Sequence, residues 1–244
     1  MTADGQQLAA VPAAGAPATT APALPSAPVS TPLAGVRKVA ARRMVEAWAA
    51  PVFHLGVDVD MTRLLGADLR SRGATVTDAI VLACVRALQA HPQLNAHFAD
   101  NVVTVFPSIN VGLAVATDAG LTVPVLADLG GEALPGIAAK RKDVVARARA
   151  GKLAMKDITG GTFTVSNLGM LGIDRFDAIL NPPQIAILAV GSTVQTPVVR
   201  DGAVTVAPLA SFTLTCDHRA VDGATGAGLL ADIRAALERG DGLE

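Results

Sequence analysis

The residues best suited to chemistry lie in one stretch near the end of the chain, TLTCDHRAVDGATGAG, residues 213–228. Its histidine, His218, stands between Asp217 and Arg219 and is followed four positions later by Asp222. An imidazole has an ordinary pKa of about 6.5, so a small shift lets it act as a general base at neutral pH. The pattern predicts either a base presented at the end of a strand or a hydrogen-bonded structural histidine.

Two other chemistries compete for this stretch. Cys216 lies two positions before His218 and hence on the same strand face, where a Cys–His nucleophile is conceivable and a small buried cysteine is the simpler interpretation. A metal site has little support, because no two of the four histidines (54, 91, 97 and 218) are four positions apart and no CxxC motif occurs. We therefore expect no metal. The absence of a GxSxG motif disfavours an α/β-hydrolase.

A second candidate lies in the glycine-rich stretch GGTFTVSNLGMLG, residues 160–172. Ser166 sits where a predicted strand gives way to a turn, so its hydroxyl either satisfies local backbone groups or faces a ligand that the glycines allow to approach. The spacing is not that of a phosphate-binding loop. A charged helical stretch over residues 132–152 is either a solvated face or a contact for an anionic cofactor.

Alternating strands and amphipathic helices must position these residues. Strict alternation predicts a strand over 52–60, a run that is apolar nearly all round predicts a buried helix capped by Thr77 or Asp78, and Asp201-Gly202 predicts a hairpin turn. A last helix is expected from Gly223 to Arg239. Because several strands follow one another without regular βα alternation, we expect an α/β protein of the α+β type, with a mixed sheet flanked by helices.

Composition sets the broad class of the protein. Residues 1–33 are rich in alanine and proline and are predicted to be a disordered tail, followed by one domain over 34–244. A net charge of -1 leaves no basic surface for nucleic acid or membranes, and no apolar run reaches the roughly 18 residues of a membrane helix. Two distant cysteines and an N-terminus without a basic region favour a cytoplasmic protein.

Taken together, the motifs resemble one known family. DHRAVDGA is similar to the DHRxxDG signature of the catalytic domain of 2-oxo acid dehydrogenase dihydrolipoyl acyltransferases, and residues 160–191 are similar to that family's other long signature. NVGLAVATDAGLTVPVL and VAARRM match further blocks in the same order. The resemblance runs from about residue 34 to residue 242.

The resemblance implies a chloramphenicol-acetyltransferase-like fold, assembled as a homotrimer with active sites at the subunit interfaces. It also implies that acetyl-CoA or another acyl-CoA is the co-substrate. The signature histidine of the family is the general base, a role that falls here to His218. Ser166 is expected to donate a hydrogen bond to the oxyanion from the neighbouring subunit.

The resemblance also implies supporting residues. Asp222 is expected to hold the site together through an arginine such as Arg43. Asn167 and Gly223 belong to the same two signatures and are expected to support the site from beside Ser166 and Asp222.

Three hypotheses remain for the acceptor. The Ala/Pro-rich tail has no lipoyl domain, so no lipoyl group is expected on this chain, and the favoured hypothesis is a stand-alone acyltransferase acting on the hydroxyl of a small molecule. Similar catalytic-domain-only enzymes act on tetronate intermediates in polyketide antibiotic biosynthesis. The alternative is the dihydrolipoyl acyltransferase core of a 2-oxo acid dehydrogenase complex, with a lipoyl-domain or acyl-carrier partner. The third is a non-catalytic trimeric scaffold.

Overall fold

The computed structural model describes residues 27–118 and 120–243. The chain divides into two units, Met1–Leu33 and Ala34–Glu244. Residues 1–33 were expected to be disordered, and most of this segment lies outside the described residues. The second unit contains both candidate site stretches.

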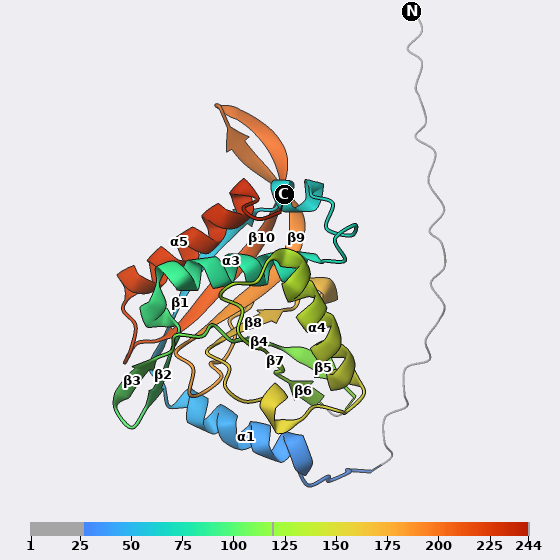
Figure 1. Ribbon diagram of the computed structural model, residues 1–244, viewed down its shortest axis with the longest axis vertical. Coiled ribbons are helices and arrows are strands. Elements are labelled where there is room, and N and C mark those ends of the chain that lie inside the picture. Colours follow the sequence, from blue (N-terminus) through green and yellow to red (C-terminus); the bar gives the residue numbers. More distant parts are fainter. Residues whose placement is uncertain (1–26, 119, 244) are drawn as a thin grey trace, which may run out of the picture. The chain divides into compact units, whose positions relative to one another are not determined.

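The second unit is built on a six-stranded mixed sheet (Figure 1). Strand β8 runs parallel to both of its neighbours, and the other pairs are antiparallel. This confirms the mixed sheet expected from the sequence. The strand order is β1 (Val52–Asp60), β10 (Ala203–Asp217), β9 (Ala186–Arg200), β8 (Phe163–Asn167), β4 (Val111–Leu113) and β7 (Val125–Leu126). Two small hairpins complete the strands: β2 (Ala96–Ala99) with β3 (Val102–Val105), and β5 (Val115–Thr117) with β6 (Gly120–Thr122).

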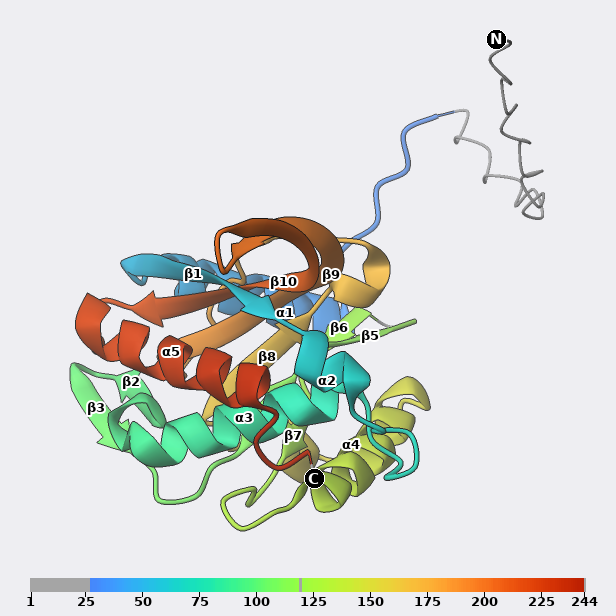
Figure 2. The same cartoon turned by 90° about the horizontal axis from the view of Figure 1, so that it is seen from above.

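Helices flank the sheet, as the sequence predicts. They are α1 (Gly35–Trp48), α2 (Thr62–Gly66), α3 (Val76–Ala90), α4 (Leu134–Arg149) and α5 (Gly223–Arg239). Figure 2 shows α3 and α5 side by side along one face of the sheet, where they cover the main core. The cap of α3 is Thr75, not Thr77 or Asp78 as expected. Asp78 lies at the third helical position and its carboxylate accepts the Thr75 amide, which completes a capping box.

The two faces of the sheet differ in chemistry. Leu214 and Cys216 of β10 point into the main core beneath α3 and α5. The opposite face carries Thr213 and Thr215 of β10 and a small apolar cluster around Ile187 and Ala189. Because side chains alternate along a strand, each row of paired residues belongs to one face, and the rows locate the site residues relative to one another.

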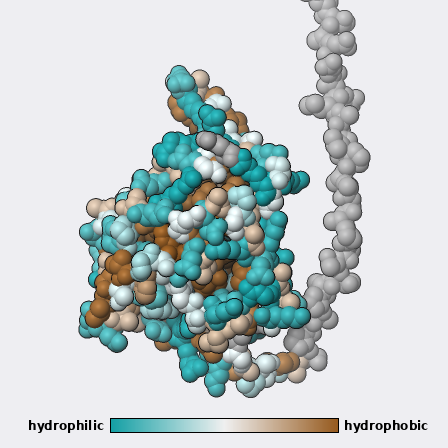
Figure 3. Space-filling model, viewed as in Figure 1, coloured by the Kyte–Doolittle hydropathy of each residue, from teal (hydrophilic) through white to brown (hydrophobic). Residues whose placement is uncertain are grey.

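Strands β9 and β10 form one long hairpin that extends beyond the sheet (Figure 1). Its turn is Asp201-Gly202, with φ of 51° and 79°, as the sequence predicts. The valines of this arm are exposed, with Val199 73% and Val204 77% accessible. Figure 3 shows a further apolar group over the β2–β3 hairpin, where Val102 and Val105 are exposed.

Candidate active site

His218 follows directly after the last residue of β10, the strand next to the edge strand β1. Its backbone amide donates to the Pro51 carbonyl at 2.8 Å, which continues the pairing of β10 with β1 by one residue. The imidazole ring packs against Phe53 of β1, with ring centroids 4.6 Å apart and planes inclined by 48°. The side chain is otherwise exposed. One face of the ring is thus held by an aromatic neighbour while the nitrogens remain accessible, as proton transfer requires.

Asp222 caps the helix that begins just after His218. Its Oδ1 accepts the Thr225 amide of α5 at 2.7 Å. The pKa of Asp222 lies below its usual range, chiefly because of the Thr225 amide and with a smaller contribution from the charge of His218. Asp222 is therefore an ionised group, fixed in place beside the histidine.

The expected ion pair between Asp222 and Arg43 does not form within the described part of the chain. Arg43 is exposed on α1, and the recorded ion pairs of the described residues do not include it. Oδ1 of Asp222 instead accepts the Thr225 amide, one of the first-turn amides of α5 that have no intrahelical acceptor.

Ser166 lies near the end of β8, half-buried on the face opposite α3 and α5. Within the described residues its hydroxyl makes no recorded hydrogen bond, so its proton is available to a ligand. Asn167 fixes the following turn, because its Oδ1 accepts the Gly169 amide at 2.9 Å and its Nδ2 donates to Thr77 at 3.3 Å. A side chain at Gly169 would collide with the backbone of Gly191, which explains the glycine there.

Gly223 is the first residue of α5 and is exposed. A Cβ atom at this position would meet nothing within 4 Å. Packing within one chain therefore gives no reason for a glycine here, and its supporting role remains a prediction.

Ser166 and His218 of the same chain lie far apart. Ser166 is in the same row as Ala189 of β9 and Thr213 of β10, whereas His218 lies five residues further along β10. At about 3.3 Å per residue and about 4.8 Å per strand, this places the two Cα atoms roughly 16 Å apart along the strands and roughly 10 Å across them. Within one chain the two side chains therefore cannot both contact the same reacting atom.

Comparison with known proteins supplies the family. The family model described as 2-oxoacid dehydrogenases acyltransferase (catalytic domain) matches residues 25–243. The chain belongs to the 2-oxoacid dehydrogenase acyltransferase family. The enzyme class expected from the sequence, an acyltransferase, is thereby confirmed.

The relatives of this acyltransferase are similar over most of its length. It is 34% identical over 213 residues to the dihydrolipoyllysine-residue acetyltransferase component of the pyruvate dehydrogenase complex from Rickettsia bellii, covering 83% of this chain and 51% of that protein. For the corresponding mitochondrial protein from Schizosaccharomyces pombe the identity is 37%, covering 85% and 45%. The chain thus spans about half the length of the curated relatives it matches. These relatives favour the dihydrolipoyl alternative over the tetronate-type acceptor that the sequence analysis preferred.

Solved structures confirm the fold. A probable dihydrolipoamide acetyltransferase from Listeria monocytogenes matches with a TM-score of 0.82 and 32% identity, over 88% of this chain and 96% of that one. The dihydrolipoamide acetyltransferase of Azotobacter vinelandii, whose catalytic mechanism was investigated at a serine, a histidine and an asparagine, matches with a TM-score of 0.81 and 25% identity, over 91% and 99%. Chloramphenicol acetyltransferase shares the fold, with a TM-score of 0.55 and 10% identity, over 80% and 94%.

The rival nucleophile in the acyltransferase, Cys216, is unsuited to that role. Its side chain is fully buried in the main core. Burial raises the pKa of its thiol to about 12, with a further rise from the charge of Asp217. Since the thiolate is the nucleophilic form, Cys216 acts as a small apolar core residue.

Three basic side chains of the charged helix α4 bond to other groups of the same chain. Arg141 Nε donates to the buried Asp78 at 2.6 Å, and Arg147 pairs with Asp143 at 2.7 Å. Lys140 donates to backbone carbonyls of the preceding loop. Lys140 and Arg141 therefore bond to other parts of the same chain, and Arg147 bonds within the helix.

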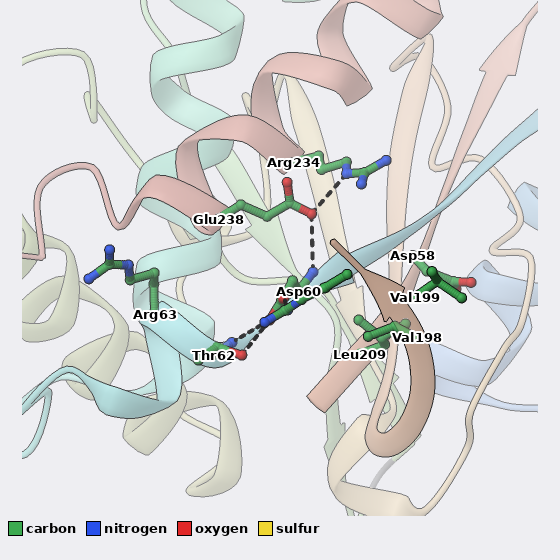
Figure 4. Close-up of a pocket in the computed structure, with 10 residues that line it drawn as sticks. Asp58, Asp60, Thr62, Arg63, Val198, Val199, Leu209, Arg234 and Glu238 are labelled. Atoms are coloured by element: carbon green, nitrogen blue, oxygen red, sulfur yellow. Dashed lines mark hydrogen bonds and ion pairs between the residues drawn. The ribbon is translucent and has the colours of Figure 1, made fainter. Parts of the chain in front are cut away.

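A polar cleft of about 690 Å³ lies at the far end of β1 from Pro51 (Figure 4). Arg234 pairs with Glu238, whose carboxylate also accepts the Asp60 amide. The charges of this cleft largely satisfy one another, and the cleft is separate from His218.

Within residues 27–118 and 120–243 no group of three or more His, Cys, Asp or Glu side chains is arranged to hold a metal ion. No described helix has the length and apolar character of a membrane span.

Proposed function

We propose that this acyltransferase moves an acetyl group between coenzyme A and the thiol of a dihydrolipoyl group. The observation that carries the proposal is the spacing of three polar residues. In the Azotobacter vinelandii enzyme the histidine follows the serine by fifty-two positions and the asparagine follows the histidine by four. Ser166, His218 and Asp222 have the same two spacings, with aspartate in the place of the asparagine.

The geometry at His218 supports direct transfer without an acyl-enzyme. An imidazole nitrogen takes the proton of the dihydrolipoyl thiol as the sulfur attacks the thioester carbonyl of acetyl-CoA. A carbon–sulfur bond forms, and the carbonyl electron pair moves to oxygen, where the Ser166 hydroxyl stabilises it. The pair then returns, the bond to the coenzyme A sulfur breaks, and the imidazolium gives its proton to the departing thiolate. Acetyl-CoA is a co-substrate in this scheme.

A homotrimer with shared sites is part of the proposal. The separation of Ser166 from His218 within one chain requires a second copy if both act on one substrate. The surface of α1 supports such a partner, because this helix exposes large apolar side chains. Val45 is 74% exposed and Trp48 is 79% exposed. A side-chain surface of this kind usually marks an interface.

The acceptor distinguishes the proposed function from the other hypotheses. Purified protein is mixed with acetyl-CoA and either dihydrolipoamide or a tetronate-type primary alcohol, and the products are identified by mass spectrometry, with His218→Ala as the control. The proposal expects transfer to dihydrolipoamide that His218→Ala loses. Transfer to the alcohol alone would contradict it in favour of a small-molecule hydroxyl acceptor, and no transfer to dihydrolipoamide would contradict the proposed acceptor. A dihydrolipoyl group carried on a lipoyl domain is the expected macromolecular partner.

A further inference from the structure

The residues on either side of His218 are bonded to each other. Arg219 donates to the Asp217 carboxylate through Nε at 2.9 Å and through Nη2 at 2.6 Å. The Arg219 backbone amide also donates to Asp217 Oδ1 at 3.0 Å. The two side chains therefore close a three-residue loop with His218 at its apex.

Asp217 of this pair is buried, and Arg219 is held against an aromatic ring. Asp217 is 3% exposed, so its charge needs a partner, and the bidentate guanidinium provides one. The Arg219 guanidinium lies over the Phe98 ring of β2, 4.3 Å from its centroid. A lysine could supply the charge without the planar two-point contact or the stacking.

The same elements are joined by backbone hydrogen bonds. The Asp217 amide donates to the Ile185 carbonyl at 2.9 Å, and the Phe98 amide donates to the Pro183 carbonyl at 2.8 Å. Asp217, Arg219 and Phe98 thus connect the end of β10 to β2 and to the segment before β9. These contacts fix the residues on both sides of His218, and Phe53 packs against its ring.

We infer that Asp217 and Arg219 are a positioning pair that sets the orientation of His218 for proton transfer. The inference rests on the proposed role of His218 as general base. Neither side chain needs to touch the substrate, because the pair acts through the imidazole. Displacement of a catalytic group by about 1 Å can cost roughly 10²-fold in rate.

The test compares Arg219→Lys with Arg239→Lys. Arg239 pairs with Asp241 through the same two nitrogens and at the same sequence spacing, but on the exposed end of α5. Arg219→Lys is expected to lower kcat by about 10- to 100-fold, with KM for acetyl-CoA and dihydrolipoamide changed by less than about 3-fold. Arg239→Lys is expected to leave both unchanged. In a His218→Ala background, Arg219→Lys is expected to cause no further loss of rate.

A structural role alone would give different results. Equal kcat values for the two lysine variants would overturn the inference, as would a loss that is as large without His218 as with it. The imidazole signals in the NMR spectrum provide a readout that needs no catalysis. Arg219→Lys is expected to shift the His218 signals, identified by their absence in His218→Ala, and to leave those of His91 unchanged. Unshifted His218 signals would refute the pair's role even if dihydrolipoamide were the wrong acceptor.

Discussion

At the scale of single residues, His218 and Ser166 have different tasks in the proposed reaction. A positioned general base contributes about 10²–10⁴-fold. One oxyanion donor contributes about 10²–10³-fold. We therefore expect His218→Ala to lower kcat more than Ser166→Ala, in steady-state assays with acetyl-CoA and dihydrolipoamide. Small and equal losses in the two variants would contradict both assignments.

The capping carboxylate of Asp222 predicts a dependence of stability on pH. Because its pKa is lower in the folded protein than its ordinary value of about 3.9, the charge stabilises the fold above that value, and this contribution is lost as the pH falls through the folded pKa. Asparagine keeps a capping oxygen without the charge, whereas alanine has neither. The difference in Tm between wild type and Asp222→Asn is expected to shrink as the pH falls from 7 to 3, in thermal unfolding followed by circular dichroism.

The alanine variant separates the cap from the charge. The difference in Tm between Asp222→Asn and Asp222→Ala reports the capping oxygen, so it is expected to persist over the same pH range. A constant gap between wild type and Asp222→Asn from pH 7 to pH 3 would show that the charge of Asp222 does not contribute to stability.

At the scale of elements, the ion pair between α3 and α4 is expected to contribute strongly to stability. Asp78 is fully buried, closes the capping box of α3 and pairs with Arg141 of α4. Removing one partner of a buried pair typically costs about 3–5 kcal/mol. Asp78→Ala is expected to lower the free energy of unfolding by this amount in urea denaturation at one fixed protein concentration.

The control for Asp78→Ala is an exposed pair. Arg175 pairs with Asp58 at 3.1 Å, and the side chains are 71% and 45% exposed. Exposed pairs contribute about 0–1 kcal/mol, so Arg175→Ala is expected to be nearly neutral. Similar losses for Asp78→Ala and Arg175→Ala would mean that the buried pair has no special role.

Elements with a strong local pattern could be predicted from the sequence. The alternation of apolar residues predicted the strand at 52–60, and the run of small residues after Asp222 predicted the helix from Gly223 to Arg239. Both elements have these bounds in the structure. The unbroken length of β9 and β10 was missed, because Pro197 and Pro208 normally interrupt a sheet. Proline is tolerated here because the projecting arm has only two strands, which leaves one edge of each unpaired.

The candidate site was less predictable, because it depends on strand order and register. The sequence does not place β8 two strands away from β10, so the distance between Ser166 and His218 could not be derived from it. Two features around His218 were also missed: the packing of its ring against Phe53, and the bonding of Asp217 to Arg219 on either side of it. Phe53 carried a signal, since it is an aromatic residue in a chain with 3% aromatics.

At the scale of the whole molecule, the proposed reaction requires the subunits to act together. The exposed apolar residues of α1 leave a surface for a neighbouring copy, and in the proposed homotrimer each site combines the β10 end of one chain with the β8 end of another. In a closed ring of three identical chains every interface is the same, so three such sites form per trimer. A single chain is therefore expected to be inactive even when correctly folded.

The most direct test of this shared site is complementation between two inactive variants. His218→Ala and Ser166→Ala are dissociated, mixed in equal amounts and reassembled, and acetyl transfer to dihydrolipoamide is measured. If the two side chains act from different subunits, about a quarter of the sites in random trimers contain both native residues, and activity rises to about that fraction of wild type. If both residues acted from one chain, no mixed trimer would hold a native site. The activity would then stay at the mean of the two variants, and the shared site would be contradicted.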